Sequence, residues 1–270
     1  MRRIVHLSDL HFGRVRPELT RPLAAAVKRV EPDLVVVSGD FTQRARESQY
    51  REARAFLDQL PQPQLCVPGN HDVPLDNIAL RAFRPWARYR RWISRDLEPQ
   101  WHDDMVSVVG ANTASPREWQ RGRISRRRLA RLCNAFETSG ADGAPRLRIL
   151  VAHHPVEQRP EDDKQPMKGG ERAAEALTAC GADVVLAGHL HSWRAAPFAA
   201  GGTLQVQAGT SLSERLRGEE NDFNLLSVTP DEVIVDRYVA GLGHDFEREF
   251  RSVFRRSRGG WTAVEGPDGP

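Results

Sequence analysis

The chain has 270 residues, of which 40% are hydrophobic and 28% charged, with a formal net charge of +3. This composition suits one sizeable folded domain and excludes an intrinsically disordered chain, and no apolar run approaches the roughly 18 residues of a membrane-spanning helix. The small positive charge favours anionic partners only weakly. The amino-terminal residues show no apolar core and cleavage site of a secretory signal, which predicts a cytoplasmic location. Cys66, Cys133 and Cys180 lie far apart among apolar neighbours, so we expect free thiols in a reducing compartment.

Strand-like and helix-like segments alternate along most of the chain. Short β-branched runs predict strands, and apolar residues at helical spacing predict the helices between them. The predicted strands are 3–8, 33–38, 64–67, 105–112, 147–152 and 182–187, and the predicted helices are 19–30, 47–60, 125–136 and 171–180. Beyond residue 194, the segments 203–208, 223–229 and 233–239 alternate as antiparallel strands. The pattern predicts a single α/β domain over residues 1–254 and a loose tail over residues 255–270.

Residues 73–104 interrupt this alternation and are predicted to be an insertion. Within it, the segment 81–101 interleaves six arginines with five aromatic residues, which are Phe83, Trp86, Tyr89, Trp92 and Trp101. Three interpretations stay open. The aromatics pack on the core as a flap, they form a lid that stacks on a substrate, or the segment contacts an anionic membrane surface at the inner face of the membrane.

Polar residues with metal-binding side chains follow five of the predicted strands. They are Asp9 and His11, then Asp40, then Asn70 with His71 and Asp72, then His153 with His154, and finally His189 with His191. Because the carboxyl ends of parallel strands meet at one edge of a sheet, we expect these side chains to lie together. Seven nitrogen and oxygen donors are too many for one tetrahedral zinc ion, and they suit two ions that share a bridging carboxylate.

The ordered motifs D-x-H, G-D, G-N-H-D, H-H-P and G-H-x-H over residues 4–191 resemble those of the calcineurin-like metallophosphoesterase family. The resemblance implies a sandwich of two mixed β-sheets flanked by helices. It also implies one ion on Asp9, His11, Asp40 and His191 and another on Asp40, Asn70, His153 and His189, with Mn, Fe or Zn as the expected metals. His153 is expected as the ligand in preference to His154.

The resemblance further implies hydrolysis of a phosphoester by a metal-bridging hydroxide, with His71 placed to protonate the leaving oxygen or to stabilise the charged phosphorane. Asp72 either orients His71 or ends the turn. The wording LSDLHFG, VSGDFTQ and PGNHD is most similar to bacterial phosphodiesterases of cyclic nucleotides and glycerophosphodiesters. A small phosphodiester is therefore the expected substrate.

Other functions stay open at this stage. One is a phosphomonoesterase or lipid-headgroup hydrolase at a membrane surface, and another is a metal-free scaffold with the same fold. Nucleic acid is not expected as a substrate, because the chain shows no DNA-clamping domain, and the oligomeric state is left open. In the polar loop 213–221, Arg215, Arg217 and Asn221 are candidate substrate contacts, with a solvated turn as the alternative.

Overall fold

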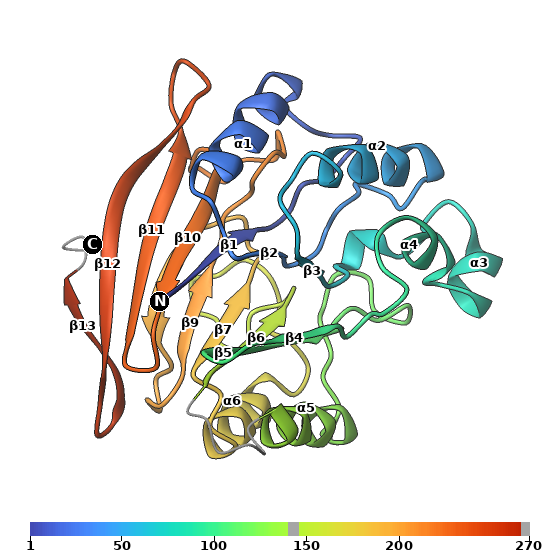
Figure 1. Cartoon of the computed structure of the whole chain (residues 1–270). Coiled ribbons are helices and arrows are strands. Elements are labelled where there is room, and N and C mark those ends of the chain that lie inside the picture. The colour runs from blue at the N-terminus through green and yellow to red at the C-terminus, as the bar shows by residue number, and fades with distance from the viewer. Residues whose placement is uncertain (140–145, 266–270) are drawn as a thin grey trace.

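Two mixed β-sheets pack face to face in the computed structural model, which describes residues 1–139 and 146–265 (Figure 1). In spatial order the first sheet contains β13 (Gly260–Glu265), β12 (Phe246–Ser257), β11 (Glu232–Ala240), β10 (Asp222–Val228), β1 (Arg2–Leu7), β2 (Leu34–Val37) and β3 (Gln64–Cys66). The second contains β4 (Gln100–His102), β5 (Val106–Ala111), β6 (Leu147–Ala152), β7 (Val184–Ala187), β9 (Leu204–Gln207) and β8 (Arg194–Pro197). Strands β1, β2 and β3 are parallel, and so are β5, β6, β7 and β9.

Helices cover the outer face of each sheet. The helices are α1 (Pro17–Arg29) and α2 (Glu47–Leu57) on the first sheet, α5 (Arg126–Ser139) and α6 (Gly170–Ala179) on the second, and the short α3 (Ile78–Phe83) and α4 (Ala87–Trp92) at one side (Figure 1). A single 3-10 turn spans Asn70–Asp72. The predicted α/β class with two mixed sheets and flanking helices is confirmed.

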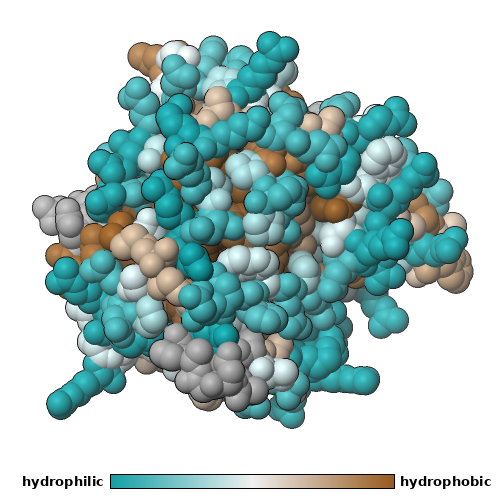
Figure 2. All heavy atoms as spheres, in the orientation of Figure 1, coloured by the Kyte–Doolittle hydropathy of each residue, from teal (hydrophilic) through white to brown (hydrophobic). Residues whose placement is uncertain are grey.

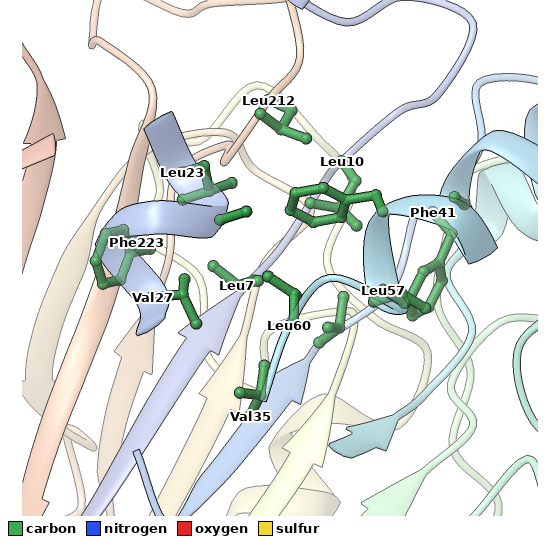
Figure 3. Close-up of a cluster of buried hydrophobic side chains, with 14 of the residues drawn as sticks. Leu7, Leu10, Leu23, Val27, Val35, Phe41, Leu57, Leu60, Leu212 and Phe223 are labelled. Atoms are coloured by element: carbon green, nitrogen blue, oxygen red, sulfur yellow. The ribbon is translucent and has the colours of Figure 1, made fainter. Parts of the chain in front are cut away.

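Three buried apolar clusters hold these layers together. The central strands β2, β5 and β7 are buried along their whole length because each sheet is covered on both sides there. Ile4 and Val36 of the first sheet face Val108 and Ile149 of the second in the central cluster. Figure 3 shows the cluster above the first sheet, where Leu23 and Val27 of α1 lie with Leu7 and Val35. The third cluster joins α5 and α6 to the second sheet.

The carboxyl-terminal residues correct two predictions. Residues 255–265 are not a loose tail, because β12 continues to Ser257 and pairs with β13, while Phe254 and Trp261 enter the central cluster. Residues 266–270 of the predicted tail lie outside the described residues. The segment 204–207 was expected to be antiparallel with the strands that follow it, but it lies in the second sheet, parallel to β7 and antiparallel to β8, a strand that the sequence did not predict.

Most aromatic side chains of the predicted insertion 73–104 pack against the core. Tyr89 is fully buried and its hydroxyl donates to the Cys66 carbonyl at 2.9 Å. Trp86 and Trp92 pack against the first cluster, and Trp101 packs against the central one. Since β4 pairs with β5, residues 100–102 belong to the second sheet and not to an insertion. The flap interpretation therefore fits four of the five aromatic residues, and Phe83 differs from them with 84% of its surface exposed.

The cysteines also differ from expectation. Cys133 of α5 and Cys180, which follows α6, form a disulfide with Cα atoms 5.6 Å apart, and only Cys66 is free. The two helices pack side by side, which brings together residues 47 positions apart in the sequence. The argument for a reducing compartment from unpaired cysteines is therefore wrong. Among the described helices, none combines the length and apolar character needed to cross a bilayer.

Candidate metal centre

Five loops place the predicted ligands at adjacent ends of the two sheets. In the first sheet β1, β2 and β3 lead to Asp9, Asp40 and Asn70, and in the second β6 and β7 lead to His153 and His189. The loops are also joined directly, since the backbone N–H of Asp9 donates to the Gly39 carbonyl and that of His11 donates to the Asp40 carbonyl. All seven predicted ligand residues are buried, with at most 8% of any residue exposed.

The backbone around this cluster is strained. Asp9, His11, Asp40, His189 and His191 all have φ between +51° and +73°, a region that residues other than glycine rarely adopt. Each such residue costs about 1–3 kcal/mol, which the surrounding structure must offset. Five strained residues in one cluster indicate that the fold keeps these side chains in position despite an unfavourable backbone conformation.

Two glycines let the loops approach each other. Gly39 has φ +99°, and a Cβ there would lie 2.7 Å from Nδ1 of His153. A Cβ on Gly188 would collide with the Ser8 hydroxyl and lie 2.5 Å from Oδ2 of Asp9. The G-D and G-H-x-H motifs therefore need glycine because loops of the two sheets touch at these points.

The first group of donors consists of Asp9, His11 and His191. Nε2 of His191 lies 3.0 Å from Oδ1 of Asp9 and 3.1 Å from Nε2 of His11. His191 uses Nδ1 to donate to the Arg215 carbonyl at 2.8 Å, so in the neutral ring Nε2 carries a lone pair. Oδ1 of Asp9 is buried without a hydrogen-bond partner. Lone pairs that converge in this way fit a cation between them.

The second group consists of Asn70, His153 and His189. Nδ1 of His153 donates to the Ser38 carbonyl at 2.8 Å, which turns Nε2 toward Oδ1 of Asn70 at 3.2 Å. Nδ1 of His189 is buried without a partner. His154, in contrast, uses both ring nitrogens, because Nδ1 lies 2.8 Å from the Thr113 hydroxyl and Nε2 lies 2.9 Å from the Gln120 carbonyl.

Asp40 lies between the two groups. Its Oδ2 is 3.3 Å from Nε2 of His153 and 3.7 Å from Nε2 of His11, and Oδ1 accepts from the backbone N–H of His71 at 2.8 Å. Burial acts to raise the pKa of Asp40, but the neighbouring histidines, His153 first, hold it well below its usual range. Burial alone would lower the pKa of His153, yet Asp40 raises it to about 9. The cluster thus retains negative charge that a cation can balance.

His71 stands beside these groups with its ring only partly exposed. Nδ1 donates to the Gln43 carbonyl at 2.8 Å, and Nη1 of Arg215 lies 3.2 Å from Nε2. Burial is the main cause that lowers the pKa of His71, and Arg215 acts in the same direction. Asp72 does not contact this ring. Its carboxylate accepts from the backbone N–H of Phe41, Thr42 and Gly69, so it ties the second and third loops together.

The three candidate substrate contacts in loop 213–221 have different surroundings. Arg215 reaches His71, and Arg217 pairs with Asp163 at 2.9 Å at the rim of a cavity of about 400 Å³. Asn221 is fully buried, and its amide donates to the carbonyls of Thr210 and Ser213. The prediction that Asn221 faces the cleft is wrong, because its side chain is consumed in bracing the loop.

Lys164 is a residue that the sequence patterns did not single out. It lines the same cavity as Arg217, together with Leu190 and Ser192, and its ammonium group donates to the His189 carbonyl. Burial lowers the pKa of Lys164 to about 8, although Asp9 and Asp40 act to raise it. Only its rarity marks it in the sequence, as one of three lysines among 39 basic residues.

Comparison with known proteins agrees with this geometry. Residues 2–193 match the family model described as calcineurin-like phosphoesterase, and the chain belongs to that family. It is similar to a probable cyclic nucleotide phosphodiesterase of Synechococcus, with 29% identity over 164 residues that cover 56% of this chain and 57% of that protein. It is also similar to the glycerophosphodiester phosphodiesterase GpdQ of Enterobacter lignolyticus, with 50% identity over 80 residues that cover 26% of this chain and 29% of that protein.

The matched region therefore spans less than two thirds of the length of either relative. Among solved structures, PhoD superposes with a TM-score of 0.72 at 12% identity, covering 98% of this chain and 71% of that one. At that identity the superposition supports the fold alone.

Proposed function

We propose that the chain is a two-metal phosphodiesterase for small diesters of the cyclic-nucleotide or glycerophosphodiester type. The observation that carries this proposal is the convergence of seven buried nitrogen and oxygen donors into two groups that share Asp40. The family match supports a phosphoesterase, and the names of the two relatives support a diester substrate.

The donor set fits two divalent cations. One would be held by Asp9, His11, Asp40 and His191 and the other by Asp40, Asn70, His153 and His189, and this mixture of imidazole and oxygen donors suits Mn, Fe or Zn. Such ions, when bound, neutralise the charge of the phosphoryl oxygens and lower the pKa of a water molecule toward neutrality. The unpartnered Oδ1 of Asp9 and Nδ1 of His189 support this use of the site.

His71 and Arg215 are proposed to act on the leaving side of the substrate. The Gln43 carbonyl holds the His71 proton on Nδ1 and turns Nε2 toward Arg215. A guanidinium at this position can bind a phosphoryl oxygen, and the imidazolium form of His71, which carries a second proton on Nε2, can transfer that proton to the leaving oxygen. Two roles for His71 follow, transfer of a proton or stabilisation of phosphoryl charge.

Lys164 is proposed to receive a further anionic group of the substrate at the edge of the 400 Å³ cavity beside the metal ligands. Arg217 lines this cavity too, but Asp163 already pairs with it, and Glu161 and Asp162 line the same cavity. We expect Lys164→Met to raise KM for an anionic diester by about tenfold, since a charge-assisted hydrogen bond contributes about 1.5 kcal/mol or more. Lys168→Met is the matched control, because Lys168 pairs with Glu118 away from this cavity. An unchanged KM in Lys164→Met would remove this residue from the substrate site.

The test of the function is an activity panel on metal-reconstituted protein. The panel contains cyclic nucleotides, a glycerophosphodiester, bis(p-nitrophenyl) phosphate and p-nitrophenyl phosphate. We expect diesters to be hydrolysed faster than the monoester, and no turnover after the metals are chelated. Faster hydrolysis of the monoester would favour a phosphomonoesterase, and turnover that survives chelation would overturn the two-metal proposal.

A cytoplasmic location stays a proposal and can be tested through the cysteines. Disulfides are rare in reducing compartments, so a cytoplasmic protein alkylated in intact cells should show Cys133 and Cys180 as free thiols. A protected disulfide between them in the same experiment would contradict this location.

A further inference from the structure

Helix α3 has no buried residue. Leu80 and Arg81 are half-buried, and the other four residues, which are apolar or small, are exposed. Ile78 and Phe83 each have 84% of their surface exposed. A helix this short has no stability of its own in water and normally depends on an apolar face packed against the protein. The next helix, α4, has the same length but buries Tyr89 completely. The exposed apolar side chains of α3 therefore lack a partner in the described chain.

Trp119 adds a third exposed apolar side chain next to this helix. It is 67% exposed, and the guanidinium of Arg81 in α3 lies 5.9 Å from its ring. Arg81 also donates to the Glu118 carbonyl at 2.9 Å, which holds α3 beside the loop that carries Trp119. We call Ile78, Phe83 and Trp119 the α3 patch. Figure 2 shows apolar side chains at the right-hand edge of the molecule, where Figure 1 places α3.

The chain segment that contains α3 is rich in positive charge. The segment 77–95 contains six arginines and no acidic residue. Arg88 and Arg91 pair with Asp76 or Glu47. Arg84, Arg90 and Arg95 are exposed and make no ion pair within the described part of the chain. This charge is complementary to an anionic partner, and the exposed Ile, Phe and Trp side chains are complementary to a partner with an apolar interior.

We infer that the α3 patch docks on an anionic lipid bilayer, with Ile78, Phe83 and Trp119 in the headgroup region and the free arginines against lipid phosphates. The three apolar side chains of the patch offer little area for a stable protein interface, whereas reversible binding to a membrane surface combines a small apolar area with electrostatic attraction to anionic lipids. Each arginine near such a surface adds electrostatic attraction to the anionic lipids.

Docking in this way would hold the candidate metal centre close to the membrane. Helix α3 begins six residues after Asp72, and Trp119 precedes Gln120, whose carbonyl lies 2.9 Å from Nε2 of His154. The patch thus follows the Asn70 loop of the centre directly and includes a residue of the loop after β5, which contacts His154 beside the centre. The inference concerns the surface alone and does not depend on the proposed substrate.

Vesicle co-sedimentation of the full chain tests this inference. The vesicles consist of phosphatidylcholine alone or of phosphatidylcholine mixed with phosphatidylglycerol. We expect binding to the anionic vesicles only, a loss of about tenfold or more in partitioning for the double variant Ile78→Ser/Phe83→Ser, and about thirtyfold for Arg84→Glu, which changes the charge by two units. The controls are Leu242→Ser, an equally exposed leucine in another loop, and Arg172→Glu on α6. Both should bind as the wild type does.

Hydrolysis of bis(p-nitrophenyl) phosphate in solution and thermal unfolding serve to check that the variants remain folded. Equal sedimentation of the wild type and the folded double variant would overturn the inference, as would equal binding to neutral and anionic vesicles. Sedimentation velocity gives the other decisive outcome. A wild-type dimer that Ile78→Ser/Phe83→Ser converts to a monomer, with no vesicle binding by either, would show that the patch is a contact between copies of the chain.

Discussion

The two sheets contribute different chemical groups to the candidate metal centre. All oxygen donors, which are Asp9, Asp40 and Asn70, come from loops of the first sheet. The second sheet contributes only imidazoles, from His153, His189 and His191. The first half therefore carries the negative charge, and neither half has enough donors for two ions. A complete centre requires correct packing of one sheet on the other.

The central apolar cluster supplies that packing. Side chains of β1 and β2 meet those of β5, β6 and β7 there, one layer away from the loops that carry the donors. Because a packed interior has few alternative arrangements, the sheets hold the loops in a fixed relation. This rigidity also sustains the left-handed backbone at five donor residues.

Asp40 offers the largest effect, because it contacts both halves. We expect Asp40→Ala to lose both metal ions and to lower turnover by more than about 10³-fold, since the carboxylate that both groups share is removed. His189→Ala removes a donor of the second group alone and should retain part of the metal. Metal content and turnover are measured on the same samples.

Asp58→Ala is the matched control for this pair, since Asp58 lies on the surface at the end of α2 and forms an ion pair with Arg54 there. It should keep wild-type metal content and turnover. Wild-type metal content in Asp40→Ala would show that the two halves bind ions independently of the carboxylate between them.

The motifs allowed most of this centre to be predicted from sequence. Donor residues follow strands, and parallel strands of one sheet bring their carboxyl ends together, so convergence was expected from order alone. What the motifs do not contain is the direction of each ring. His153 and His154 are adjacent in sequence, yet their different roles depend on Ser38, Thr113 and Gln120, which lie in other loops.

Features without a local pattern escaped prediction. Lys164 reaches the centre from an irregular loop, and Asn221 looks like a polar turn residue although it is fully buried. The final strands are rich in arginine, which hides the inward-facing Phe254 and Trp261. The pairing of Cys133 with Cys180 depends on the packing of two helices and not on sequence spacing.

His71 is the next largest expected effect, because it tests the leaving side of the reaction and not the metal-binding halves. His71→Ala should keep its metal and lower kcat by about 10²–10⁴-fold for a substrate with an alkyl leaving group. The p-nitrophenyl group leaves without a proton. If His71 transfers a proton, the loss with p-nitrophenyl esters should be much smaller, and if it stabilises phosphoryl charge, the two losses should be alike.

His102→Ala is the control for this experiment, since His102 lies exposed on the edge strand β4. Loss of metal in His71→Ala would instead assign His71 to the metal-binding groups. Wild-type kcat with an alkyl ester would exclude it from both roles.

The smallest expected effect concerns His6, a histidine of the first sheet that does not reach the centre. Its Nε2 lies 2.9 Å from the Ser38 hydroxyl, and burial lowers its pKa to about 3. The ordinary pKa of an unfolded histidine is about 6.5. Between these values the unfolded chain binds a proton that the folded chain does not, so the contribution of His6 to stability is lost as the pH falls.

We therefore expect His6→Gln to reduce the pH dependence of the free energy of unfolding by up to about 1.4 kcal/mol per pH unit below pH 6. Urea titrations of both proteins, each with a chelator present so that bound metal does not contribute, measure this slope. The variant is less stable at neutral pH because glutamine replaces a packed ring, but only the slope bears on the argument. Parallel curves for the two proteins would mean that His6 takes up its proton in the folded chain as readily as in the unfolded one. His6 would then not be distinguished from the histidines of the centre as one that stays neutral within the sheet.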